Sequence, residues 1–185
     1  CLRVKLRGCD WFSLKGRPMP QLQHKLAFRQ VLKYQLDVTL MDESEPDVDE
    51  LELLVVLKVG DQGALTTESR IENRSGPVKV PEDLTRPGKF QMGQSLPDFL
   101  PSLPEGDLKE GDSWTVDGAF FELTAIKGDV AEIVSRKVVE NPRTEIEWLY
   151  EFDFKLGRVV LAQSVTETQP KGRNLRRLCE YELLD

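Results

Sequence analysis

The sequence is poor in the residues and runs that most enzymes and membrane proteins need. It has one histidine and three cysteines, and its longest apolar run is Leu53 to Leu57. A membrane-spanning helix needs about 20 apolar residues, so none is expected. The histidine, His24, stands between Gln23 and Lys25, and the chain has no G-x-S-x-G motif. We interpret His24 as a surface residue. Acyl-transfer triads need a histidine or a substitute as the base, and transition-metal sites need nitrogen ligands, so we predict neither an enzyme nor a metal site.

Nucleotide and nucleic-acid binding are also disfavoured. The glycines form neither GxGxxG nor GxxxxGK[ST], the loops that cradle phosphates. The net charge is −7 and the isoelectric point is near 5.0, whereas a nucleic-acid surface is basic. A basic cluster (Lys171, Arg173, Arg176 and Arg177) lacks aromatic neighbours for base stacking, and we interpret it as a turn and a charged edge strand. We therefore predict no cofactor and no nucleic-acid partner.

Charge is unevenly distributed along the chain. Residues 1–35 carry eight Lys and Arg and one acid, Asp10. Residues 42–52 carry several acids and no Lys or Arg. The two regions neutralise each other in the fold, or the basic region rests on anionic lipid headgroups. The acidic stretch "MDESEPDVDE" (41–50) lacks the glycine turn of an EF-hand, so we expect a solvated loop.

The cysteines, Cys1, Cys9 and Cys179, have no zinc-site spacing. One interpretation makes Cys1 the lipid-modified first residue of a mature lipoprotein and pairs Cys9 with Cys179 in a disulfide. The other leaves three reduced, buried thiols. The first implies an extracytoplasmic location and the second permits a cytoplasmic one.

Hydrophobic periodicity predicts an all-β protein. Residues alternate between apolar and polar in short runs that Gly-Asp, Asn-Pro or Gly-containing turns separate, and no 3.6-residue period interrupts them. The expected strands are 2–7, 28–41, two runs around Gly60, 113–116, 119–126, 130–139, 144–155, 158–168 and 175–184. The pattern is typical of an antiparallel meander that forms a sandwich or a half-open barrel.

The chain length suits a single β-rich domain spanning residues 1–185. A Pro- and Gly-rich stretch, residues 75–107, excludes a long helix or a central strand and would connect two halves, 1–87 and 88–185. "VVLKVGDQGALTTESRIEN" and "FELTAIKGDVAEIVSRKVVEN" both run from strand through a Gly-Asp turn to strand. They indicate either an internal repeat or chance similarity between two hairpins.

Aromatic residues gather in the second half. Trp148, Tyr150, Phe152 and Phe154 share one face of a strand, because alternate residues point the same way. This face is either ordinary core or the wall of an apolar groove. Trp114 follows two Gly-Asp turns, where Asp107 and Asp112 suit turn positions, and we expect it to close one end of the core.

Three segments carry a family resemblance: "LPEGDLKEGDSW", "FFELTAIKGDVAEIVSRKV" and "FDFKLGRVVLAQSVTET". Over residues 50–168 the chain resembles a group of bacterial secreted or lipid-anchored β proteins of unknown function. Leu108 stands where that group often has valine. The resemblance implies export and a β architecture, and it implies no reaction.

Together these features predict a non-enzymatic, extracytoplasmic envelope protein that binds an apolar ligand or a protein partner. The alternative is a structural or interaction domain of a larger envelope assembly. A hydrolase with an unrecognised carboxylate pair is the third hypothesis.

Overall fold

A single antiparallel sheet dominates the computed structural model, which describes residues 20–42, 48–75, 80–169 and 174–184. Its strands are β1 (Val31–Asp42), β2 (Val48–Val59), β3 (Ala64–Ser75), β4 (Gly88–Gln91), β5 (Ser113–Val116), β6 (Ala119–Lys127), β7 (Val130–Glu140), β8 (Arg143–Asp153), β9 (Arg158–Thr168) and β10 (Leu175–Leu184). A 3₁₀ turn, η1 (Asp61–Gly63), and a short helix, α1 (Glu82–Thr85), complete the elements. No helix in the described ranges is long and apolar enough to cross a membrane.

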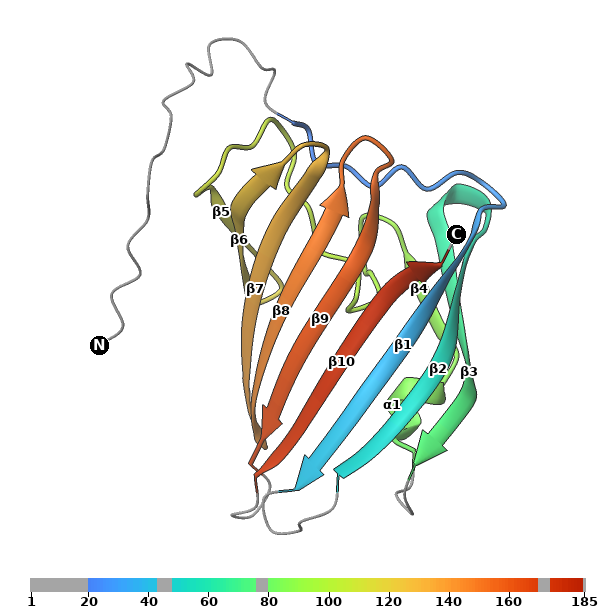
Figure 1. Cartoon of the computed structure of the whole chain (residues 1–185). Helices are drawn as coiled ribbons and strands as arrows, with labels where there is room; N and C mark the ends of the chain where they lie inside the picture. The colour runs from blue at the N-terminus through green and yellow to red at the C-terminus, as the bar shows by residue number, and fades with distance from the viewer. Residues whose placement is uncertain (1–19, 43–47, 76–79, 170–173, 185) are drawn as a thin grey trace, which may run out of the picture.

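Neighbouring strands in the sheet are also neighbours in sequence, except that β1 pairs with β10. Their order in the sheet is β4-β3-β2-β1-β10-β9-β8-β7-β6-β5, so β1 pairs with β10 and the two ends of the sheet, β4 and β5, remain apart. Figure 1 shows the strands as a strongly curved strip that does not close into a barrel. The prediction of an all-β, predominantly antiparallel meander is confirmed, and the open, curved sheet is consistent with the predicted sandwich or half-open barrel. The division into halves near residue 87 stays a prediction.

Two sequence interpretations were wrong about where strands lie. The expected loop at 41–50 is shorter, because β1 runs to Asp42 and β2 begins at Val48, with Met41 opposite Val48 in the ladder. Apolar alternation, seen in the burial of Leu51 and Leu53, extends β2 into the acidic stretch. The expected edge strand with Arg176 and Arg177 is β10, which lies in the middle of the sheet. The expected strand 2–7, Cys1 and Cys9 lie outside the described residues.

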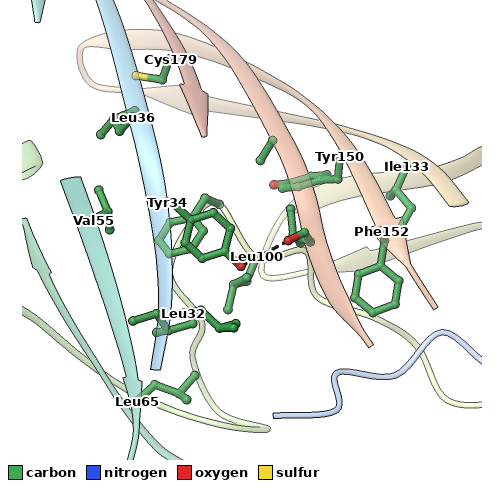
Figure 2. Close-up of a cluster of buried hydrophobic side chains, with 14 of the residues drawn as sticks. Leu32, Tyr34, Leu36, Val55, Leu65, Leu100, Ile133, Tyr150, Phe152 and Cys179 are labelled. Carbon is green, nitrogen blue, oxygen red and sulfur yellow. Dashed lines mark hydrogen bonds between the residues drawn. The ribbon is translucent and has the colours of Figure 1, made fainter. Parts of the chain in front are cut away.

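The two faces of the sheet differ as the alternation requires. The convex face is exposed to solvent; cross-strand ion pairs such as Arg136–Glu147 and Arg176–Glu167 lie on it, and so do exposed apolar side chains such as Val138. The concave face carries the buried apolar side chains; Leu32, Tyr34 and Leu36 of β1, for example, are at most 5% exposed. Figure 2 shows these residues gathered in one buried cluster with Val55 of β2 and Tyr150 and Phe152 of β8.

The connection between β4 and β5 covers this concave face. It follows α1 and the edge strand β4, and it has no long helix or central strand, as predicted. Figure 1 shows it running along the inner side of the curved sheet. Phe99, Leu100 and Leu108 of this stretch are buried in the core, together with Leu84 of α1. The stretch that reads as a linker is therefore the second layer of the fold.

A second covering segment, residues 20–28, runs along one rim of the sheet (Figure 1). Leu22 is buried, and the Lys25 amide donates to the carbonyl of Gly157 at 2.8 Å in the β8–β9 turn. Gly157 has φ +69°, and a Cβ there would lie 2.4 Å from Cβ of Lys25. Only glycine fits both the backbone conformation and the close approach.

Candidate ligand-binding cavity

A cavity of about 870 Å³ lies between the concave face of β5–β10 and the two covering segments. Its volume is within the range of about 300–1,000 Å³ that small-molecule sites occupy. Residues 21–24 and 92–106 supply one wall, and inward-facing side chains of the sheet supply the other. The cavity is thus built where the cover and the sheet do not fully meet.

The strand register arranges the inward-facing side chains in rows across the sheet. The row through Trp148 contains, from β2 to β6, Leu51, Val38, Cys179, Ser164, Trp148, Ser135 and Phe121. The next row toward the 20–28 rim contains Tyr181, Ala162, Tyr150, Ile133 and Leu123. The row on the opposite side of Trp148 contains Asp49, Leu40, Arg177, Thr166, Ile146 and Lys137. Neighbouring rows are two residues apart along each strand, or about 7 Å.

The predicted aromatic stripe divides into two parts. Trp148 and Tyr150 line the cavity, with their rings stacked at a centroid distance of 5.4 Å. Phe152 is fully buried beneath His24, and Phe154 lies just beyond β8, partly buried against the core. The structure therefore places half of the stripe at a cavity and half in packed core.

The interpretation of His24 as an exposed surface residue needs correction, because its side chain is partly buried and one ring nitrogen is fully buried. Its ring packs edge-on against Phe152 at 5.3 Å, and Nε2 donates to the Pro101 carbonyl at 2.8 Å in the neutral tautomer. Nδ1 is buried with no hydrogen-bond partner among the described residues. Burial lowers the pKa of His24, and the bond to Pro101 opposes that shift only in part. His24 therefore anchors the covering segments as a neutral side chain.

Two tyrosine hydroxyls fasten other elements across the concave side. Tyr150 donates to the Asp98 carbonyl at 3.0 Å, which ties the covering segment to β8. Tyr34 donates to the Val159 carbonyl at 3.3 Å. Burial raises the pKa of both phenols above the usual range, so both remain neutral donors at neutral pH.

Trp114, on the edge strand β5, lies at the rim of the cavity region. It is partly buried, it stacks on Phe121 at 5.6 Å, and its Nε1 donates to the Ser102 carbonyl at 2.7 Å. Asp112 accepts the Lys109 amide at 3.0 Å, a turn bond of the kind predicted for it. Trp114 thus joins the edge of the sheet to the cover.

Two cations reach the cavity from the sheet. Arg177 of β10 donates from Nη1 to Asp83 Oδ2 of α1 at 2.5 Å, and its buried Nε has no partner among the described residues. Lys137 of β7 is exposed and has no ion-pair partner in the described part of the chain. Sequence analysis missed this pair, because only the register places them in one row.

The described residues contain no group of three or more His, Cys, Asp or Glu that could hold a metal ion. Cys179 lies buried in the row through Trp148, and burial raises the pKa of its thiol. Its proposed partner, Cys9, is outside the described residues, so the disulfide stays a prediction.

The fold and the cavity define a curved, open antiparallel sheet whose concave side is covered by irregular chain. No family model matches the sequence, and no curated protein matches it. Among solved structures, the fold is similar to one described as lipid–protein interactions in lipovitellin, with a TM-score of 0.51 and 9% sequence identity. The match covers 87% of this chain but 26% of that one, and at this identity it shows the fold alone.

Proposed function

We propose that the protein is a non-enzymatic binding protein that holds an apolar ligand in the cavity of β5–β10. The observation that carries the proposal is the cavity itself, which opens beside Trp148, Tyr150 and Phe121. Large aromatic side chains with a few polar groups are the usual lining of small-molecule sites.

The cavity is long enough for an extended ligand. Its lining reaches from Ile146 to His24, and His24 packs on Phe152. Ile146 and Phe152 are six residues apart on β8, which corresponds to about 20 Å along the strand. The similarity to the fold of lipovitellin, whose structure is described in terms of lipid–protein interactions, supports an apolar chain as the ligand.

We also propose an extracytoplasmic location at the cell envelope, with Cys1 as the candidate lipid anchor. The family resemblance over residues 50–168 supports this location. Expression of the full-length gene with radiolabelled palmitate tests the anchor. We expect label in the wild type and none in Cys1→Ser, and label that persists in the variant would contradict the assignment.

A neutral apolar probe tests the binding function. N-phenyl-1-naphthylamine should bind with one site per chain and gain fluorescence, and 1-tetradecanol should displace it. Trp148→Ala should weaken this binding by roughly tenfold, which corresponds to about 1.4 kcal/mol of lost contact. Val138→Ala is the control, because Val138 is 52% exposed and points away from the cavity residue Lys137. Equal affinities in the wild type and Trp148→Ala would contradict the assigned site.

A further inference from the structure

The concave face changes character along its length. The row through Tyr150 is apolar apart from its phenols, and the row through Trp148 adds Ser135 and Ser164. The third row, two residues further along each strand, brings Arg177, Thr166 and Lys137 into line. A ligand lying along the strands would therefore meet an apolar wall at one end and cations at the other.

Arg177 has hydrogen-bonding capacity that the fold leaves unused. A guanidinium carries five N–H donors in a planar fork that matches a carboxylate or a phosphate. In Arg177, Nη1 bonds to Asp83, and Nε has no partner among the described residues. Its side chain is 29% exposed, while that of Asp83 is 60% exposed. A solvated ion pair of this kind is weak, so a bound anion can compete with Asp83 for the fork.

Lys137 approaches the same space from the other side. Three strand intervals, or about 14 Å along the sheet, separate β7 from β10. The sheet is curved across these strands (Figure 1), and the register places both residues in an inward-facing row. Between them lie Ile146 and the Thr166 hydroxyl, which can donate one further hydrogen bond.

The acidic groups of the cavity lie elsewhere. Glu105 and Asp98 belong to the cover, and Asp117 lies in the β5–β6 turn. All three are exposed, so water screens their charges. The same sheet row also contains Asp49, but that residue lies on β2, two strands from Arg177 and outside the cavity lining. Within the cavity, the charged members of the row are therefore the two cations, Arg177 and Lys137.

From this arrangement we infer that the ligand is a single-chain amphiphile with an anionic headgroup, a carboxylate or a phosphate. Arg177, Lys137 and Thr166 bind the headgroup, and the chain lies over Trp148 and Tyr150 toward His24. This inference rests on the proposed function, because it assigns a chemical class to the ligand of the same cavity.

The test compares four amphiphiles with the same 14-carbon chain on the full-length protein: tetradecanoate, tetradecyl phosphate, 1-tetradecanol and tetradecyltrimethylammonium. Displacement of N-phenyl-1-naphthylamine, below the critical micelle concentration of each, gives the affinities. We expect at least one anion to bind about tenfold more tightly than the alcohol, the gain of a charge-assisted hydrogen bond. The cation should bind more weakly than the alcohol. The carboxylate and phosphate arms show which headgroup the site prefers.

Matched variants locate the headgroup. Arg177→Gln and Lys137→Gln should each reduce binding of the preferred anion, by roughly tenfold and threefold, and leave that of 1-tetradecanol unchanged. Asp83→Asn should strengthen anion binding, because it removes the carboxylate charge that competes for the Arg177 guanidinium. Arg176→Gln is the control: Arg176 is the next residue of β10, points to the convex face and pairs with Glu167. Lys137 is exposed, so its variant tests the idea even if Arg177→Gln fails to fold.

The outcomes distinguish a failure of the headgroup assignment from a failure of the apolar binding site. If 1-tetradecanol binds as tightly as both anions, or if Lys137→Gln and Asp83→Asn leave the anion-to-alcohol ratio unchanged, the headgroup assignment is wrong and the apolar site stands. If none of the four amphiphiles binds, the proposed function fails, and the headgroup site fails with it.

Discussion

The two ends of the sheet use their concave faces differently. Over β1–β4 the cover closes on rows of leucine and valine, and Leu53 and Leu57 are fully buried. The cavity there, near Phe99 and Phe90, measures about 160 Å³. Over β5–β10 the rows contain Trp148, Ser135 and Thr166, and the cavity measures about 870 Å³. The same alternation builds both regions, so the difference comes from side-chain type and from how closely the cover fits.

This comparison indicates a division of labour. The β1–β4 region is closely packed and should contribute most to the stability of the fold. The β5–β10 region is less completely filled and supplies the binding site. Substitutions in the first region should therefore change the free energy of unfolding with little effect on ligand affinity, whereas substitutions in the cavity region should change the ligand affinity as well.

The largest expected effect is in the packed region. Leu53→Ala removes a fully buried side chain and should lower the free energy of unfolding by about 2–5 kcal/mol. Urea denaturation followed by circular dichroism measures the change. Val138→Ala, on the exposed convex face, should cost less than about 0.5 kcal/mol. A loss for Leu53→Ala as small as the control's would contradict the packed character of β1–β4.

Trp114→Ala should have a smaller effect. A fully buried tryptophan costs about 3–5 kcal/mol when truncated, and Trp114 is only partly buried, so we expect about 1–2 kcal/mol. Trp114→Phe keeps the stacking on Phe121 but removes the Nε1 bond to Ser102, and it separates the two contributions. Because Ser102 lines the cavity, both variants should also weaken binding of 1-tetradecanol. Unchanged binding would show that the cover is held in place without Trp114.

The two tyrosines give a matched comparison between the regions. Tyr34→Phe and Tyr150→Phe each remove one hydroxyl hydrogen bond and should each cost about 1 kcal/mol of stability. Tyr150→Phe should also alter the affinity for 1-tetradecanol, because it releases the cover at Asp98, whereas Tyr34→Phe should not. Displacement titrations on both variants measure the difference. If the two variants bind 1-tetradecanol equally well, the hydroxyl bond of Tyr150 has no special role in ligand binding, which would contradict the proposed difference between the regions.

The smallest effect concerns pH. The pKa of His24 is lower in the folded state than in the unfolded state, so the unfolded state binds more protons once the pH falls below about 6.5. Stability should therefore decrease on acidification through this window, by at most about 1.4 kcal/mol per pH unit. His24→Gln removes this titration, so the slope between pH 6.5 and 5.5 should be shallower in the variant. Identical slopes would contradict the burial of a neutral His24.

The sequence was sufficient for most of the sheet. Short runs of apolar and polar residues between glycine-containing turns located β9 and β10 to the residue. It was insufficient for the covering layer. Proline and glycine remove any periodicity from residues 92–112, and the burial of Phe99 and Leu100 depends on contacts with distant strands. The burial of His24 has the same origin, since the Pro101 carbonyl lies 77 residues away.

The candidate site was predictable only in part. The spacing of Trp148 and Tyr150 in β8 was visible as an aromatic stripe, whereas the facing residues come from other strands and from the cover. The row of Arg177, Thr166 and Lys137 requires the strand order, in which β10 pairs with β1 and so becomes central. No local pattern encodes that order, which is why Arg177 was assigned to an edge strand.

The central claim is that an apolar chain occupies the β5–β10 cavity and not the packed β1–β4 region. Photolysis of the full-length protein with a tetradecanol that carries a diazirine in its chain, followed by peptide mass spectrometry, tests it directly. The account predicts adducts on peptides that contain Trp148, Tyr150 or Phe121 and on the cover around Leu100, suppressed by excess 1-tetradecanol. Adducts concentrated on β1–β3, or spread evenly over the chain and insensitive to competition, would contradict it.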